Sequence, residues 1–182
     1  MHQLMPFKQH YLPFFFGIAL TGSAVFIYPQ RSLVLTALML FLPLLDRHWQ
    51  LPRPNISKYR LILLSLCSFS ILILMGLNTD YTTIALTTLL TAALPEEWFF
   101  RGYFMMRIEN MGLRAYQANI ITSLLFALLH LPTQGVFGLS IFVPSMIYGW
   151  IFQKSKDIVL VILLHALSNI VFFSYIKTYL NR

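Results

Sequence analysis

The sequence carries little charge: Asp, Glu, Lys and Arg make up 10% of its 182 residues, against about 25% in an ordinary soluble domain. Hydrophobic residues make up 58%, and they come in long blocks, as a lipid bilayer requires of the segments that cross it. A soluble domain and a disordered chain both need more charge than this. The sequence therefore predicts an integral membrane protein.

Several other features are absent. Cys67 is the only cysteine, so no disulfide can form within the chain. The serine-nucleophile pattern Gly-x-Ser-x-Gly and the helical zinc pattern His-Glu-x-x-His do not occur, although both are common signs of hydrolases. No repeat, low-complexity tract or long linker divides the chain, which predicts a single transmembrane domain over residues 1–182.

What is present is a series of apolar segments. A membrane-spanning helix needs about 20 residues, and Ser32–Leu45 is short by that measure. We therefore expect six to eight spans, with seven preferred, in an all-α, polytopic transmembrane helical bundle. Pro29, Pro52 and Pro132 are expected to lie in connections, because proline ends helices. The seven segments are Tyr11–Tyr28, Ser32–Leu45, Arg60–Leu77, Tyr81–Ile108, Arg114–Leu131, Val136–Phe152 and Asp157–Tyr179.

The basic residues test this topology. Three of the thirteen, Arg31, Lys177 and Arg182, fall on the side away from the N-terminus, and Arg101 lies within a segment. Because cytoplasmic loops are enriched in Lys and Arg, we expect a multi-pass protein of the inner (cytoplasmic) membrane with a cytoplasmic N-terminus. This distribution points to the lipid bilayer as partner and not to nucleic acid. The N-terminal side carries nine: Lys8, Arg47, Arg53, Lys58, Arg60, Arg107, Arg114, Lys154 and Lys156.

The acidic residues are few, and two of them are misplaced for a membrane helix. Glu96 and Glu97 lie inside the fourth segment, where a charge costs about 2.5–3.5 kcal/mol on insertion scales. Glu97 stands four residues before Arg101, the favourable order for a helical ion pair. Glu96 has no such partner and is a candidate for function. The other four are expected to meet water in connections or at segment ends: Asp46, Asp80, Glu109 and Asp157.

Two histidines also lie in apolar segments. Phe126 stands one turn before His130, and Asn169 stands one turn after His165. A single histidine in a membrane helix is most often an interhelical contact. Together with Glu96, however, these residues could activate a water and bind the oxyanion that forms when it attacks an amide. The alternative use of Glu96, His130 and His165 is a site for a divalent metal such as zinc.

At these residues the sequence resembles the CAAX-protease and bacteriocin-processing (CPBP) family of intramembrane endopeptidases. The family's Glu-Glu-x-x-x-Arg motif matches residues 96–101 and is followed by Gly102. Its Phe-x-x-x-His motif matches residues 126–130, and its His-x-x-x-Asn motif matches residues 165–169. Each motif alone is weak, but all three occur in order, and each lies in an apolar segment.

The resemblance implies a catalytic core over residues 81–179 with a water-filled cavity, and a glutamate-type mechanism without a metal. It implies that Glu96 activates the water together with His130, and that His165 and Asn169 form the oxyanion hole. It also implies three residues that stabilise the site: Glu97, Arg101 and Phe126.

The expected substrate is a membrane protein or lipoprotein, cleaved near its C-terminus as in the sorting of surface proteins. The chain is short and resembles the compact bacterial members of the family, so a prenylated substrate is not implied. Two other functions stay open at this point, a proton-coupled membrane transporter and a non-catalytic membrane scaffold or immunity protein. A transporter would use the same buried Glu and His residues to relay protons, but many transporters have internal repeats.

Overall fold

The computed structural model describes residues 11–26, 30–54, 58–77 and 79–176. In these residues it contains helices and no β-strand, which confirms the predicted all-α class. Four residues used in the predictions lie outside the described part of the chain: Lys8, Pro29, Lys177 and Arg182. The C-terminal ends of the first and last predicted segments lie outside it as well.

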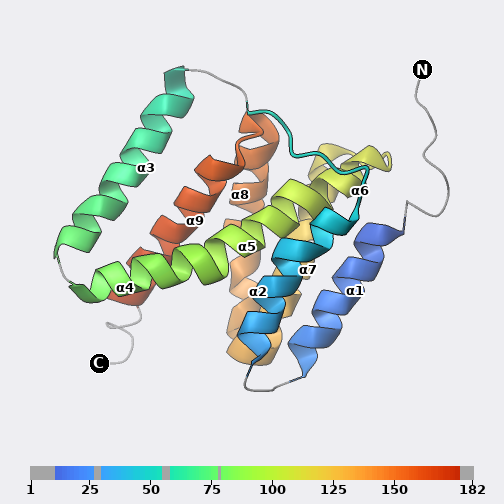
Figure 1. Cartoon of the computed structure of the whole chain (residues 1–182), viewed down its shortest axis with the longest axis horizontal. Helices are drawn as coiled ribbons and strands as arrows, with labels where there is room; N and C mark the ends of the chain where they lie inside the picture. The colour runs from blue at the N-terminus through green and yellow to red at the C-terminus, as the bar shows by residue number, and fades with distance from the viewer. Residues whose placement is uncertain (1–10, 27–29, 55–57, 78, 177–182) are drawn as a thin grey trace.

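The first half of the chain forms three helices. They are α1 (Leu12–Val25), α2 (Arg31–Phe41), which is extended by the 3-10 turn η2 (Leu42–Leu45), and α3 (Lys58–Leu77). These helices coincide with the first three predicted segments. In Figure 1, α1 and α2 lie side by side and antiparallel, whereas α3 lies on the opposite flank of the molecule.

The fourth predicted segment is one long helix that crosses the molecule diagonally (Figure 1). Its five parts follow one another without a break: α4 (Thr79–Thr88), η3 (Leu89–Ala93), α5 (Leu94–Glu97), η4 (Trp98–Met105) and α6 (Met106–Asn110).

Two of those parts, η3 and η4, are π-helical and flank Pro95. Proline has no amide hydrogen, and its ring clashes with the carbonyl four residues earlier. A wider turn relieves that clash: before Pro95, the Leu94 N–H donates to Leu89 O, five residues back. Pro95 therefore loosens the helix without breaking it, next to the two glutamates, and π-helical turns are often found at functional sites.

The last three predicted segments form a hairpin and a final helix. They are α7 (Ala115–Gln134), the 3-10 turn η5 (Gly135–Ile141), α8 (Phe142–Ser155), α9 (Ile158–Val171) and the π-helical η6 (Phe172–Ile176). The prediction that Pro132 lies in a connection is wrong, because Pro132 lies inside α7. Pro132 falls in the last turn, so its missing N–H removes one hydrogen bond close to the end of the helix. Gly135, which follows the last residue of α7, has a φ of +58°.

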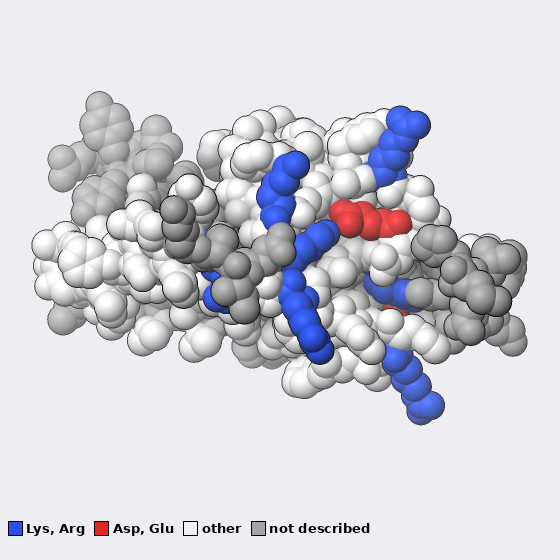
Figure 2. Space-filling model, turned by 90° about the horizontal axis from the view of Figure 1, so that it is seen from above, with Lys and Arg blue, Asp and Glu red and all other residues white. Residues whose placement is uncertain are grey.

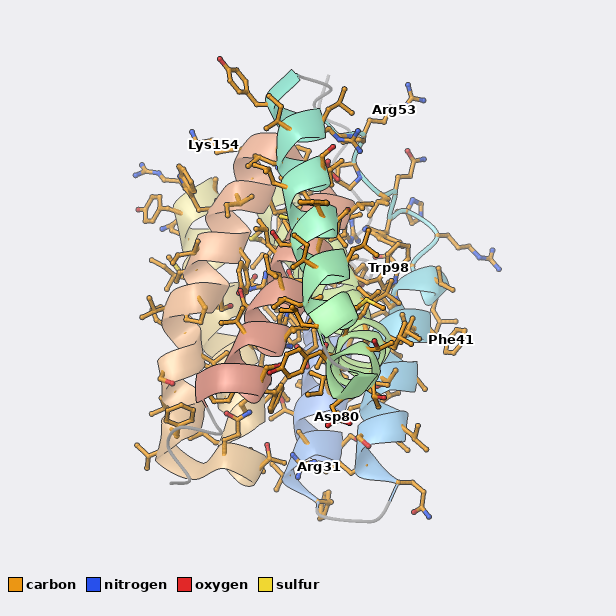
Figure 3. The ribbon with its side chains drawn as sticks, turned by 90° about the vertical axis from the view of Figure 1, so that its left-hand side faces the viewer. Arg31, Phe41, Arg53, Asp80, Trp98 and Lys154 are labelled. Carbon is orange, nitrogen blue, oxygen red and sulfur yellow. The ribbon has the colours of Figure 1, made fainter. Side chains whose placement is uncertain are left out.

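The helices run alternately up and down, so the connections at residues 46–54, 111–114 and 156–157 meet at one end of the molecule (Figure 1). We call this the basic end. Figure 2 looks onto it and shows Lys and Arg side chains gathered there. Arg53 and Lys154 lie at this end in Figure 3, whereas Arg31 and Asp80 lie at the other.

Two acidic residues at the basic end are buried, contrary to the expectation that water surrounds them. Asp46 pairs with Arg107 at 2.8 Å and accepts a hydrogen bond from the Tyr103 hydroxyl at 3.2 Å. Asp157 pairs with Arg60 and caps α9 by accepting from the amides of residues 159 and 160. Both carboxylates are covered because a basic side chain from another helix neutralises them, which sequence position alone does not reveal.

Two helical stretches of the described residues are long and apolar enough to cross a membrane, Tyr59–Leu77 and Ala115–Ser155, the second of which includes the bend at η5. Leu12–Val25, Arg31–Leu45 and Ile158–Ser174 are apolar but shorter. The seven predicted segments thus coincide with helices, but the predicted seven spans are not confirmed.

Candidate active site

The site is built around the adjacent carboxylates of α5. Neighbouring helical residues point about 100° apart, so Glu96 and Glu97 enter different surroundings. The Glu97 side chain is fully buried, whereas that of Glu96 is 15% exposed and borders a cavity. Both nevertheless reach the same imidazole ring, that of His165 in α9.

The fully buried carboxylate of Glu97 lies between the guanidinium group of Arg101 and the imidazole ring of His165. Its Oε1 accepts hydrogen bonds from Arg101 Nη1 at 3.0 Å and from His165 Nδ1 at 2.7 Å. The predicted ion pair between Glu97 and Arg101 is therefore present. The contact with His165 is not predicted by the helical spacing, since it joins two helices 68 positions apart.

Arg101 is held by the neighbouring helices α7 and α8. Its Nη2 donates to the carbonyl oxygen of Ser145 at 2.9 Å and to the Ser145 hydroxyl at 2.7 Å. Its guanidinium carbon lies 5.0 Å from the ring centroid of Phe126 and 6.0 Å from that of Tyr148, both within the range of a cation–π contact. Arg101 thus joins the glutamate helix to both helices of the C-terminal hairpin.

His130 points from α7 toward Glu96. Its Nδ1 lies 2.8 Å from the carbonyl oxygen of Phe126, and because a carbonyl can only accept, Nδ1 carries a proton there. The other ring nitrogen, Nε2, lies 4.0 Å from Glu96 Oε1. The backbone contact thus fixes which nitrogen faces the carboxylate.

His165 approaches Glu96 from α9. Its Nε2 lies 3.7 Å from Glu96 Oε2, and its ring stacks on Tyr148 with centroids 5.4 Å apart and planes 23° apart. Both imidazole nitrogens that face Glu96 are farther from it than a direct hydrogen bond allows. This spacing leaves Glu96 accessible to a small molecule in the cavity.

The cavity has a volume of about 400 Å³ and is lined mainly by apolar atoms. Its inner wall holds Glu96, His130, His165 and Phe126. Asn169 also lines it, one turn beyond His165 on α9. The structure therefore brings all seven of the predicted site residues to one place: four on the cavity wall and Asn169 beside them, with Glu97 and Arg101 buried behind the wall.

The described residues include no group of three or more His, Cys, Asp or Glu side chains arranged as a metal site. Glu96, His130 and His165 do converge, and each histidine has its second nitrogen engaged, as metal ligands often do. The metal-free mechanism and the alternative of a zinc site at Glu96, His130 and His165 therefore both stay predictions to be tested.

The motifs do not identify two residues of α8, Ser145 and Tyr148. Ser145 holds Arg101, and Tyr148 packs against both Arg101 and His165. The sequence indicates them only by the i, i+3 spacing of two polar side chains in the apolar residues 142–152 of α8, which places both on one face of the helix. The motifs also do not identify Gly138 in η5, where a Cβ would lie 2.9 Å from the backbone carbon of His130.

The arrangement contains a carboxylate and an imidazole that can share a proton, and a second imidazole and an amide that can donate to an oxyanion. No curated protein and no solved structure matches the chain. A family model described as "Type II CAAX prenyl endopeptidase Rce1-like" matches residues 78–171, which is more than half of the chain and includes all three motifs. That family consists of membrane-embedded proteases. The chain belongs to the Rce1-like family of type II CAAX prenyl endopeptidases.

Proposed function

We propose that the chain is an intramembrane endopeptidase in which Glu96 and His130 activate a water molecule. The observation that carries this proposal is the convergence of Glu96 with the Nε2 atoms of two histidines, at 4.0 and 3.7 Å, on the wall of the cavity. Separations of this size leave room for a water that contacts both the carboxylate and an imidazole.

In the proposed reaction the water attacks the carbonyl carbon of the scissile peptide bond. Its proton passes to Glu96, with His130 Nε2 accepting a hydrogen bond from the water. When the tetrahedral intermediate collapses, the carbon–nitrogen bond breaks and the proton is delivered to the leaving amine. General acid–base catalysis of this kind contributes about 10²–10⁴-fold to the rate.

The oxyanion of the intermediate requires hydrogen-bond donors. We assign that function to His165 Nε2 and to the side-chain amide of Asn169. His165 then carries a proton on each ring nitrogen. The two carboxylates that face its ring, Glu97 at 2.7 Å from Nδ1 and Glu96 at 3.7 Å from Nε2, balance its charge together with that of Arg101. Removing one such donor in other enzymes lowers kcat about 10²–10³-fold.

Three residues position the catalytic groups. Glu97 orients His165, Arg101 holds Glu97 between α7 and α8, and the carbonyl oxygen of Phe126 orients His130. None of them needs to touch the substrate for this function. Replacing Glu97 or Arg101 should therefore affect kcat more than KM, because the geometry of the bound state is disturbed and not its contacts.

The cavity walls favour an apolar substrate. Its volume of about 400 Å³ lies within the range of small-molecule sites and admits a few residues of an extended peptide. Apart from Glu96, the two histidines and Tyr148, none of the lining residues is ionisable. We propose that the substrate is a membrane protein or lipoprotein, cut within an apolar stretch near its C-terminus, and that no prenyl group is required.

The test is cleavage by the purified chain reconstituted in lipid vesicles, with apolar peptides as substrates and mass spectrometry of the products. Glu96→Gln and His130→Ala should each abolish detectable cleavage. Glu109→Gln is the matched control, because Glu109 lies outside the site and contacts Gln153 and Lys156. Full activity in Glu96→Gln would overturn the proposed mechanism, and a retained pH-linked ion flux would favour the transporter.

A further inference from the structure

The positive charge of the described residues is concentrated at one end of the molecule. Of the ten described Lys and Arg residues, Arg31 is at the opposite end and Arg101 is within the site. Figure 2 shows the surface of the basic end, and Figure 3 shows Arg53 and Lys154 there and Arg31 far from them. The remaining eight lie at the basic end: Arg47, Arg53, Lys58, Arg60, Arg107, Arg114, Lys154 and Lys156.

The cavity extends from Glu96 toward the other end. Its lining includes Gln134 in the last turn of α7, Phe137 and Ser140 in η5, and Phe173 in η6. These elements all lie at the end opposite the basic one (Figure 1). No lining residue comes from a connection at the basic end. The cavity lining thus runs from Glu96 toward the end opposite the basic one.

Short loops rich in Lys and Arg remain on the cytoplasmic side of a membrane. We propose that the basic end is cytoplasmic, so that the cavity opens on the side of the membrane away from the cytoplasm. Its substrate is therefore an exported polypeptide whose apolar segment enters the site from the outer half of the bilayer. The substrate class rests on the proposed protease function, whereas the orientation does not.

The cavity mouth fits such a segment. Phe137 and Phe172 stack with ring centroids 6.3 Å apart, and Phe137 is 56% exposed. The lining contains neither Lys nor Arg. Its protonated imidazole, His165, is assigned to the oxyanion, so no further cation is left to pair with a terminal carboxylate. We therefore expect an internal bond next to apolar side chains to be cut, with a free substrate C-terminus not needed.

The orientation is tested by cysteine labelling of the full chain. Cys67 is replaced by alanine, and single cysteines are introduced as Val136→Cys or Thr133→Cys near the cavity mouth and Arg53→Cys at the basic end. Val136 is 81% exposed, and neither Val136 nor Thr133 lines the cavity. A membrane-impermeant maleimide is added to right-side-out and to inverted membrane vesicles.

We expect Val136→Cys and Thr133→Cys to be labelled in right-side-out vesicles and Arg53→Cys in inverted ones. The reverse pattern would overturn the proposal and place the cavity on the cytoplasmic side. Failure to label either mouth position in both preparations would also overturn it, because the mouth would then lie in hydrocarbon. Labelling needs no catalysis, so this failure is distinguishable from failure of the proposed function.

The proposed substrate class is tested in a separate cleavage experiment. An apolar, quenched fluorescent peptide with an amidated C-terminus is added to the two vesicle preparations, each containing the wild-type chain or Glu96→Gln. Cleavage that depends on Glu96 and is at least tenfold faster in right-side-out vesicles is the expected result. Equal rates in both preparations, or a requirement for a free carboxylate, would overturn the proposed substrate class while leaving the protease function intact.

Discussion

Glu97 accepts a hydrogen bond from His165 across 2.7 Å, although the two residues are 68 positions apart. The same carboxylate oxygen accepts from Arg101 at 3.0 Å. Adjacent carboxylates of one helix thereby contact the two nitrogens of one imidazole, since Glu96 approaches Nε2 at 3.7 Å. This relationship links the ion pair of the first motif to the histidine of the third.

The first prediction concerns the stability of this buried network. Replacing Glu97 with Gln keeps an acceptor oxygen but leaves the buried Arg101 without a counter-charge. Removing one partner of a buried ion pair costs about 3–5 kcal/mol, and we expect a loss of that size in the free energy of unfolding. Unfolding in detergent, followed by circular dichroism, measures it.

Glu109→Gln is the matched control for that substitution, because Glu109 is partly exposed and lies 3.6 Å from Lys156. A pair of this kind contributes about 0–1 kcal/mol. Equal losses of unfolding free energy in Glu97→Gln and Glu109→Gln would contradict the claim that the buried ion pair of Glu97 stabilises the fold.

The second prediction concerns Gly138. A Cβ at this position would lie 2.9 Å from the backbone carbon and 3.0 Å from the backbone oxygen of His130, so Gly138→Ala must displace η5 or the end of α7. Misplacing a catalytic group by about 1 Å can lower a rate about 10²-fold. We expect kcat to fall by at least tenfold in the peptide-cleavage assay.

Gly102→Ala serves for comparison, because its Cβ would meet its nearest neighbour, Leu51, at 3.4 Å, an ordinary contact. It should keep most of the activity. Wild-type kcat in Gly138→Ala, in protein that unfolds at the wild-type temperature, would show that the close approach does not position His130.

The third prediction concerns Tyr148, which stacks on His165 and donates a hydrogen bond to Ser168 at 2.7 Å. Tyr148→Phe keeps the ring and loses only an exposed hydrogen bond, so activity should stay within a few-fold of wild type. Tyr148→Ala removes the ring from both His165 and Arg101 and should lower kcat strongly. The ratio of the two kcat values measures the importance of the stacking, and a ratio near one would contradict it.

The fourth prediction concerns metal. Because we propose that Glu96 and His130 activate the water directly, cleavage should persist after dialysis against a chelator, and added zinc should not raise it. Metal analysis of the dialysed protein is the control. Activity that is lost on chelation and restored by zinc would favour the alternative in which Glu96, His130 and His165 bind the metal.

Much of the site was predictable because membrane helices restrict which residues can lie inside them. Ionisable residues are rare there, so Glu96, Glu97, His130 and His165 are conspicuous in the sequence. The spacing of Glu97 and Arg101 predicts their ion pair. The apolar segments predict the helices for the same reason, since only apolar blocks of sufficient length can form them.

The contacts between helices were not predictable from spacing. Ser145 and Tyr148 lie in a helix with no acidic, basic or histidine residue at its centre, and only packing brings them to Arg101. Asp46 occupies a connection, where water is the ordinary surrounding, yet Arg107 covers it. Pairings of this kind depend on how the helices are arranged, which a single sequence does not encode in any local pattern.

The most direct test of the central claim compares the C-termini of membrane proteins in source cells that carry the wild-type chain or Glu96→Gln. Equal amounts of both chains in the membrane must be confirmed by immunoblotting. We predict that uncleaved C-terminal peptides of at least one exported protein appear only in the Glu96→Gln cells, which would identify the substrate as well. Identical C-termini in the two strains would contradict a Glu96-dependent protease.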